Sequence, residues 1–278
     1  MERADIHLGN PAVRGPLTVF PVFNGAAVAR PGYRLDHAAL AVAEREGAPR
    51  VDELVVRNEA AEAALVLEGE VLEGGWQHRV AVRSAMVRGG EAIVLPVRCV
   101  EQGRWSGAVR HERRGRRAPV AVRAAADEQA AVWERVGRYG ASATGSLLET
   151  TDRVERTAAR LVAGLAPLPF QTGVLFGVGG QPLLLEVFDC PDTLGGVWDR
   201  LLTATAIDAV GAPVVATPGR RARRLVQRLR SVPLHNVDGG AGLGRHGSSD
   251  RLRLSTLTWH GRAVHTVAVN LRHGLVAA

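Results

Sequence analysis

The sequence is poor in several residue types, and each shortage excludes a class of protein. It has only two cysteines, Cys99 and Cys190, in 278 residues. That is too few for a disulfide framework or a zinc site of clustered thiolates, so we read both as reduced, with one bridge between them as the alternative. No stretch reaches the roughly eighteen apolar residues of a membrane-spanning helix, and the start MERADIHLGN has no apolar signal segment. We therefore expect a cytoplasmic protein with no membrane partner.

Lysine is absent: all 35 basic residues are arginine, and the formal net charge is +7. Alanine, glycine and valine are abundant as well, which is typical of GC-rich coding and weakens the charge as evidence for a polyanionic partner. Arginine nevertheless suits bidentate binding of phosphate or carboxylate. Tyrosine and phenylalanine are scarce, with 2 and 5 residues, so we do not expect an aromatic platform for single-stranded nucleic acid.

The first hundred residues show the alternation of strands separated by turn residues. We predict strands at residues 17–23, 52–58, 63–68, 77–87 and 91–97. The last two flank Gly89 and Gly90, a hairpin-type turn. Asp36 is placed to cap an alanine-rich helix from about residue 37 to 46. This part therefore reads as an antiparallel sheet or barrel with one helix.

The rest of the chain mixes helices and hairpins. Apolar residues at helical spacing predict helices at residues 124–139 and 151–165. Strands at residues 174–178 and 183–188 flank Gly179-Gly180, and a last hairpin joins residues 251–259 and 263–271 around His260-Gly261. Between these hairpins, Asp192 caps a helix and Thr217-Pro218 opens a basic one. The buried face of the Asp192 helix is predicted to hold Val197, Trp198, Leu201 and Leu202.

These elements predict an α+β fold, with an N-terminal antiparallel β sheet or barrel, central helices and further antiparallel hairpins toward the C-terminus. We divide the chain into a β-rich part, residues 1–118, and an α+β part, residues 119–278. One continuous domain is the alternative.

Function-capable side chains are densest between Glu68 and Trp105. In the segment EGEVLEGGWQHR, which starts at Glu68, the glycines allow a sharp turn, and Gln77 and Arg79 then share one face of a strand. A second segment, VRCVEQGRWSG, follows, and there Glu101, Arg104 and Trp105 leave a strand end. If both segments meet, carboxylates for acid and base chemistry, an arginine for an anion and an aromatic face for a ring come together.

We therefore assign candidate roles to six residues, namely Glu70 and Glu101 as catalytic carboxylates and Gln77, Arg79, Arg104 and Trp105 as ligand-binding groups. The alternative is a hairpin end stabilised by Glu–Arg pairs, with Trp105 covering the core. The sequence assigns no cofactor and no metal, and a metal site of His78 with Glu70 is a minor alternative.

The same segments resemble a known family. GEVLEGGWQHRV, VLPVRCVEQGRWSG and the later EQAAVWERV resemble the ARPP-1 domain family, which is associated with ADP-ribosylglycohydrolase and rhodanese-phosphatase proteins. The matching residues are Gly69, Glu70, Leu72, Gly74, Gln77, Arg79, Pro96, Val97, Cys99, Val100, Glu101, Gly103, Arg104, Trp105, Gln129, Val132 and Trp133. Trp76 stands where the family commonly has lysine, and His78 where it has asparagine. The resemblance implies that this surface is functional, with an ADP-ribose-like or phosphorylated metabolite as the implied ligand.

Other motifs are read as structural. Cys99 lies in an apolar strand and is expected to be an inert core residue. Residues 242–247 match the GxGxxG pattern but lack the preceding strand and following helix of a dinucleotide site, so we predict a flexible loop. The arginine runs at residues 110–117, in a predicted loop, and 220–230, in a helix, are read as solvated basic faces.

Three functions remain. The first is binding or processing of an anionic small molecule at the six candidate residues, by an enzyme or by a binding protein. The second is a non-catalytic protein-interaction module in which the same residues only brace the fold. The third and weakest is nucleic-acid binding through the arginine-rich surface.

Overall fold

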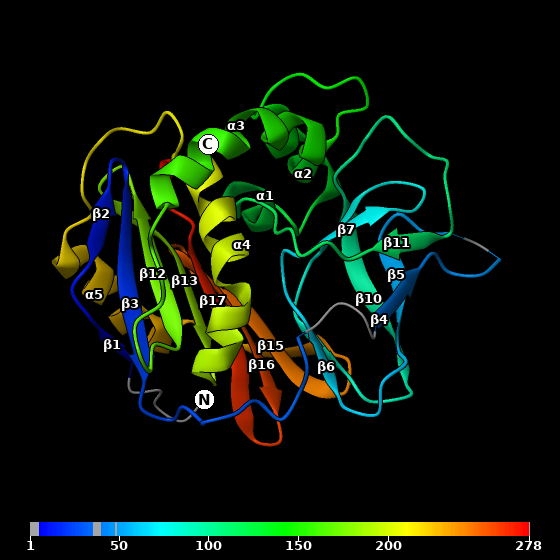
Figure 1. The fold of residues 1–278 in the computed structure, drawn as a ribbon, viewed down its shortest axis with the longest axis horizontal. Coiled ribbons are helices and arrows are strands. Elements are labelled where there is room, and N and C mark those ends of the chain that lie inside the picture. Colours follow the sequence, from blue (N-terminus) through cyan, green and yellow to red (C-terminus); the bar gives the residue numbers. More distant parts are fainter. Residues whose placement is uncertain (1–5, 36–39, 48, 278) are drawn as a thin grey trace. The chain divides into compact units, whose positions relative to one another are not determined.

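The computed structural model describes residues 6–35, 40–47 and 49–277. The chain forms two compact units. We call them the sheet unit (Met1–Pro31, Arg156–Val237 and Leu243–Ala278) and the barrel unit (Gly32–Glu155 and Asp238–Gly242). Both consist of antiparallel strands with helices packed on them, which confirms the α+β class (Figure 1).

The barrel unit contains a closed antiparallel barrel in the strand order β10-β5-β4-β11-β7-β8. Its strands are β4 (Leu40–Ala43), β5 (Glu53–Asn58), β7 (Val71–Gly74), β8 (Arg79–Ala81), β10 (Ala92–Cys99) and β11 (Arg110–Glu112). A short ladder of β6 (Ala64–Val66) and β9 (Ala85–Val87) accompanies it. Leu54, Leu72 and Leu95 belong to its fully buried core. The predicted N-terminal sheet or barrel is confirmed.

The helices of this unit pack on the outside of the barrel strands. They are α1 (Val120–Ala124), α2 (Gln129–Gly137) and the start of α3 (Leu147–Val162). Val80 of β8 packs with Val122 and Val132 of these helices, whereas its neighbour Ala81 belongs to the barrel core. Strand β8 is therefore buried on both faces, so buried and exposed residues do not alternate along it.

Three predictions for this unit were wrong in part. Residues 40–43 of the predicted helix form β4, which pairs with β5 and β11, while Asp36 and residues 37–39 lie outside the described residues. Leu40 and Val42 alternate with less buried neighbours, so barrel closure overrides the helix propensity of the alanines.

The predicted strand at residues 77–87 is divided into β8 and β9, and these pair with different partners. β9 pairs with β6, whereas β10 pairs with β5 and β8, so β9 and β10 are not a hairpin. The turn at Gly89-Gly90 is nonetheless present, with Gly90 at φ 74°. Of the predicted helix at residues 124–139, Gln129–Gly137 form α2, whereas Ala124 is the last residue of α1. The predicted helix at residues 151–165 is present as α3, which begins at Leu147 and ends at Val162.

The sheet unit is built on a nine-stranded antiparallel sheet in the order β1-β3-β12-β13-β17-β16-β15-β14, with β2 paired to β3. The strands are β1 (Ile6–Leu8), β2 (Ala12–Arg14), β3 (Leu17–Asn24), β12 (Gly173–Val178), β13 (Gln181–Phe188), β14 (His235–Gly239), β15 (Gly242–Ser248), β16 (Leu252–Trp259) and β17 (Arg262–Asn270). The hairpins at Gly179-Gly180 and His260-Gly261 are confirmed, because β12 pairs with β13 and β16 with β17.

Helices α4 (Pro191–Ala209) and α5 (Gly219–Arg228) pack on this sheet, followed by a 3-10 turn (Leu229–Ser231) and the short α6 (Gly274–Ala277). Figure 1 shows α4 in front of β12 and β13. Leu225 and Leu229 pack into a core with Leu175 and Leu185, so the basic helix also has an apolar face that packs on the sheet. The predicted buried residues of α4 are also confirmed: Val197, Trp198, Leu201 and Leu202. Among the described residues, each helix is too short or too polar to cross a bilayer.

Two local predictions for this unit are corrected. Asp192 lies in the first turn of α4, and the N-cap is Cys190. The GxGxxG segment is strand β15, paired residue by residue with β16, rather than a loop. Its last glycine, Gly247, is required by packing, because a Cβ there would lie 1.8 Å from the Pro233 carbonyl oxygen. The last glycine of the motif therefore reflects the close approach of two backbones.

Candidate functional site

Polar side chains occupy one end of the barrel. Directly paired residues point to the same side of a sheet, and Arg79 on β8 is paired with Leu72 on β7 and Cys99 on β10. His111 on β11 is paired with Val42 on β4. Since Leu72 and Val42 are core residues of the barrel, Arg79, Cys99 and His111 also point inward. The apolar interior thus ends in a layer of ionisable groups.

Glu44 joins this layer directly after β4, two residues beyond Val42. Its Oε1 accepts hydrogen bonds from the Trp76 amide at 3.2 Å and from His111 Nε2 at 3.0 Å. Glu44 is 2% exposed and His111 6%. Burial lowers the pKa of His111, with the Glu44 carboxylate opposing it. The other ring nitrogen, Nδ1, lies 3.4 Å from the Leu72 carbonyl oxygen, so both nitrogens of the imidazole face acceptors.

Arg79 is fully buried, and only part of its guanidinium is used. Nη1 donates to Gln77 Oε1 at 3.0 Å, and Nη2 lies 3.8 Å from Glu44 Oε1, beyond hydrogen-bond length. Nε and Nη2 have no hydrogen-bond partner among the described residues, and the same is true of Glu44 Oε2. Burial lowers the pKa of Arg79, but a guanidinium remains charged at neutral pH. The edge formed by Nε and Nη2 is the fork that binds an oxyanion in a bidentate manner.

Glu101 lies beside this layer, and both its carboxylate and its backbone carbonyl accept hydrogen bonds. Its Oε2 accepts from Arg104 Nη2 at 2.6 Å and from the His78 amide at 3.0 Å, and its carbonyl accepts from Gln77 Nε2 at 3.0 Å. Burial alone would raise the pKa of Glu101, but the hydrogen bonds from Arg104 and the His78 amide hold it below its ordinary value. Gln77 connects Glu101 to Arg79, so these residues form one network.

Arg104 fixes the loop that covers the network. Besides Glu101, its guanidinium donates to the carbonyl oxygens of Gly74, Gly75 and Ser106 at 3.3, 2.8 and 2.8 Å. The next residue, Trp105, is 45% exposed. Its ring centroid lies 5.6 Å from Arg79 Cζ, within the range of a cation–π contact. The ring also meets Trp76 edge-on, with centroids 5.2 Å apart.

The structure brings together five of the six predicted residues, namely Gln77, Arg79, Glu101, Arg104 and Trp105. Glu70 is engaged elsewhere, because Arg113 binds its carboxylate through two hydrogen bonds of 2.8 and 2.9 Å. Both side chains of this pair are nearly buried, at 4% and 3% exposed. Such a pair fits the bracing role that the sequence offered as the alternative for these glutamates.

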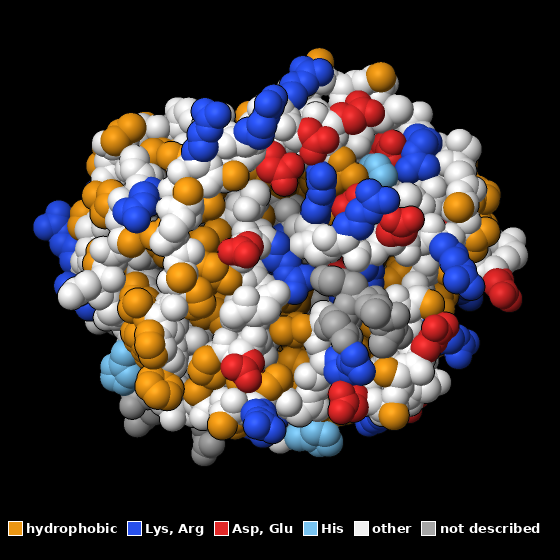
Figure 2. All heavy atoms as spheres, in the orientation of Figure 1, with side chains coloured by type: hydrophobic (Ala, Val, Ile, Leu, Met, Phe, Trp, Pro, Cys, Tyr) orange, Lys and Arg blue, Asp and Glu red, His pale blue; other side chains and the backbone are white. Residues whose placement is uncertain are grey.

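The predicted solvated loop at residues 110–117 is wrong in part for the same reason. Residues 110–112 form β11, Arg113 pairs with Glu70, and Arg117 is 5% exposed and donates to the Glu68 carbonyl. The basic helix α5 does expose most of its arginines. On the face of the molecule in Figure 2, however, arginine side chains are interspersed with acidic and uncharged ones.

Cys99 is confirmed as a buried free thiol, and Cys190 is also free. The Cys99 thiol donates to the Glu101 carbonyl at 3.3 Å, and burial raises its pKa. A protonated, buried thiol is a poor nucleophile. His78 Nδ1 accepts from the Gly74 amide at 2.8 Å. Within the described part of the chain, no group of three His, Cys, Asp or Glu residues could hold a metal ion.

Glu44 and His111 were missed by the sequence reasoning. The alternation of Leu40, Val42 and Glu44 was a signal, but the alanines between them favoured a helix. His111 was hidden among exposed charges, since Arg110 and Glu112 on either side point to solvent.

A family comparison matches nearly the whole chain. The model of the ARG and Rhodanese-Phosphatase-superfamily-associated Protein domain, ARPP-1, matches residues 5–269. The chain belongs to the ARPP-1 family. The matched residues include parts of both the barrel unit and the sheet unit. Neither the curated proteins nor the solved structures contain a significant match.

Proposed function

We propose that the polar end of the barrel binds an oxyanion of a small molecule, a phosphorylated or ADP-ribose-like metabolite. The observation that carries the proposal is the buried edge of Arg79, whose Nε and Nη2 have no hydrogen-bond partner among the described residues. A buried charge without such partners is costly. A phosphate or carboxylate matches this edge in geometry and charge.

In this proposal the other network residues have positioning and covering roles. Gln77 holds Nη1 of Arg79, and Glu101 holds Gln77 and Arg104 in place. A carboxylate with a lowered pKa that already accepts several hydrogen bonds is a weak general base, so Glu101 is assigned to orienting the site. Trp105, half-exposed above the guanidinium, is the side chain that must move for a ligand to reach Arg79, and it offers a ring face to a sugar or base.

A thermal-shift series tests this function with four probes: inorganic phosphate, ribose 5-phosphate, ADP-ribose and uncharged ribose. At about ten times the dissociation constant, a bound ligand adds about 1.4 kcal/mol, or roughly 3 °C in melting temperature. We expect the phosphorylated probes to raise the melting temperature and ribose to have no effect.

Arg79→Lys provides the decisive comparison, because lysine keeps the charge but lacks the bidentate fork. The shift should disappear in Arg79→Lys and persist in Arg57→Lys, a control at an exposed position of β5 in the same barrel. An unchanged shift in Arg79→Lys, or no shift with any phosphorylated probe, contradicts the proposal and leaves the network with the bracing role alone.

A further inference from the structure

Glu44 contributes a further buried polar atom at the barrel end that has no hydrogen-bond partner among the described residues. Its Oε1 accepts from the Trp76 amide at 3.2 Å and lies 3.0 Å from His111 Nε2, whereas Oε2 is unpaired. The residue is 2% exposed. A buried charged oxygen that accepts no hydrogen bond is costly to the fold, so Oε2 is suited to accept one from a ligand.

This oxygen lies close to the unpaired edge of Arg79. Nη2 of Arg79 is 3.8 Å from Oε1 of Glu44, and Oε2 is bonded to the same carbon as Oε1. The guanidinium can only donate hydrogen bonds, whereas the carboxylate can only accept them. A ligand that meets both groups must therefore present an acceptor to Arg79 and a donor to Glu44.

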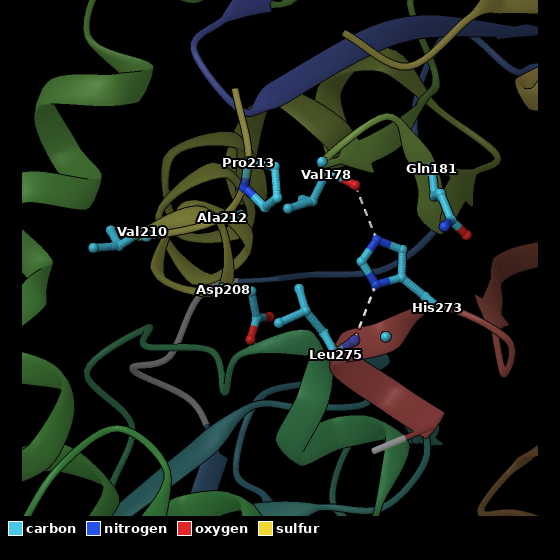
Figure 3. Close-up of a pocket in the computed structure, with 11 residues that line it drawn as sticks. Val178, Gln181, Asp208, Val210, Ala212, Pro213, His273 and Leu275 are labelled. Atoms are coloured by element: carbon cyan, nitrogen blue, oxygen red, sulfur yellow. Dashed lines mark hydrogen bonds between the residues drawn. The ribbon is translucent and has the colours of Figure 1, made fainter. Parts of the chain in front are cut away.

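The unpaired atoms distinguish the barrel end from a cavity of about 420 Å³ in the sheet unit (Figure 3). Val178, Pro213 and Leu275 contribute aliphatic walls to that cavity. Both nitrogens of its His273 are engaged, because Nε2 donates to the Val178 carbonyl at 3.0 Å and Nδ1 accepts from the Leu275 amide at 3.2 Å. In the described part of the chain, the cavity lining includes no buried side-chain nitrogen or oxygen that lacks a hydrogen-bond partner. These atoms therefore favour a polar ligand at the barrel end.

We propose that the barrel end selects oxyanions that also carry a hydroxyl group, with Glu44 Oε2 accepting a hydrogen bond from that hydroxyl. The selection rests on the proposed function, because it requires Arg79 to bind the oxyanion. The hydroxyl is bonded either to phosphorus, as in hydrogen phosphate, or to a nearby carbon, as in a sugar phosphate. Sulfate and the dianion of an alkyl phosphate have no such donor. Their oxygens would face the Glu44 carboxylate with like charge, in an interior that screens the repulsion poorly.

Two pairs of probes test the selection, and the members of each pair differ in the hydroxyl donor. Inorganic phosphate is compared with sulfate, and glycerol 3-phosphate with n-propyl phosphate, by calorimetric titration of the full chain at pH 8 and constant ionic strength. Both esters are dianions at this pH, because the second pKa of a phosphate monoester is about 6. Inorganic phosphate retains one hydroxyl on phosphorus. We expect the hydroxyl-bearing member of at least one pair to bind at least about tenfold more tightly, since a hydrogen bond to a charged group contributes that much.

The pattern of preference identifies the donor. A preference in the first pair assigns the donor to phosphorus, and a preference in the second pair assigns it to carbon. Equal binding within both pairs overturns the selection but leaves the proposed function intact, because Arg79 then needs only the oxyanion. Binding of none of the four probes contradicts the proposed function, and the selection with it.

Glu44→Gln tests whether Glu44 causes the preference. Because Oε1 accepts from the Trp76 amide, the glutamine NH2 group should take the place of Oε2, where it donates a hydrogen bond instead of accepting one. The probe without the hydroxyl should then bind about as tightly as its partner. Glu112→Gln, at an exposed position of β11, should keep the wild-type preference. A preference that persists in a folded Glu44→Gln contradicts the role of Glu44, and the wild-type comparison decides the proposal if this variant does not fold.

Discussion

Arg79 lies beneath Trp105. The guanidinium carbon is 5.6 Å from the centroid of the indole ring, and Trp105 is 45% exposed while Arg79 is fully buried. Trp105 thus contacts the guanidinium and Trp76 and remains partly exposed to solvent. Trp105 is therefore one of the groups that cover Arg79, together with the loop that Arg104 holds in place.

Replacing that side chain should make Arg79 reactive. In Trp105→Ala we expect phenylglyoxal, an arginine reagent, to modify Arg79, because the ring that covers it is gone. The lost burial and cation–π contact should lower stability by about 1–2 kcal/mol. Peptide mass spectrometry measures the modification at each arginine. Trp105→Phe keeps a ring over the site and serves as the control, and equal protection of Arg79 in all forms would show that Trp105 is not the cover.

Glu44 should be required for stability as the buried partner of Arg79 and His111. Glu44→Gln removes the negative charge and leaves the Arg79 guanidinium uncompensated, which should cost about 3 kcal/mol. Urea unfolding measures this difference. The double variant Glu44→Gln/Arg79→Met should recover part of the loss, since the charge left unpaired is then gone as well. A single variant as stable as the wild type would show that the pair contributes nothing.

Part of the site can be predicted from short segments of the sequence. Gln77 and Arg79 are two residues apart in a predicted strand, so alternation places them on one face; in the structure β8 begins at Arg79, and Gln77 lies just before it. Glu101, Arg104 and Trp105 were expected near them because they leave a strand end. These are local inferences, and the structure confirms that the two segments meet.

Glu44 and His111 were not predicted as site residues, because they come together only through pairing between distant segments. His111 reaches Glu44 because β11 is inserted between β4 and β7, with His111 paired to Val42 and to Gly74. Barrel closure of this kind is not encoded in any window of the sequence. The same closure turns residues 40–43 into a strand, against the helix propensity of the alanines. Glu70, by contrast, has the right residue type and spacing, yet Arg113 from a strand-end arginine run binds it.

Stability should fall in mild acid because of buried histidines. Burial lowers the pKa of His273 below its ordinary value of 6.5, and the pKa values of His78 and His111 are also lowered. Below about pH 6.5 the unfolded chain therefore binds protons that the folded chain does not, so the free energy of unfolding decreases as the pH falls toward the folded-state pKa values. Above that window these groups are neutral in both states and have no effect.

Denaturant unfolding from pH 8 to pH 5 measures this dependence. The slope below pH 6.5 should be smaller in His273→Leu than in the wild type, because one of the groups that take up protons on unfolding is removed. An identical slope in the variant would show that His273 does not contribute. The reverse sign, with stability rising in acid, would contradict burial as the cause of the lowered pKa.

Gly75 should be far less replaceable than Gly90, although both adopt a left-handed backbone, at φ 59° and 74°. A Cβ at Gly75 would lie 2.1 Å from the His111 ring, which is fully buried and bonded to Glu44, whereas a Cβ at Gly90 meets nothing within 4 Å. Gly90→Ala should therefore lower the free energy of unfolding only by the strain of alanine in a left-handed backbone conformation, about 1–2 kcal/mol. Gly75→Ala adds the displacement of His111 and should cost roughly 3 kcal/mol or more. Urea unfolding of the two variants gives the comparison, and equal losses would mean that the His111 ring can move aside without breaking the bond to Glu44.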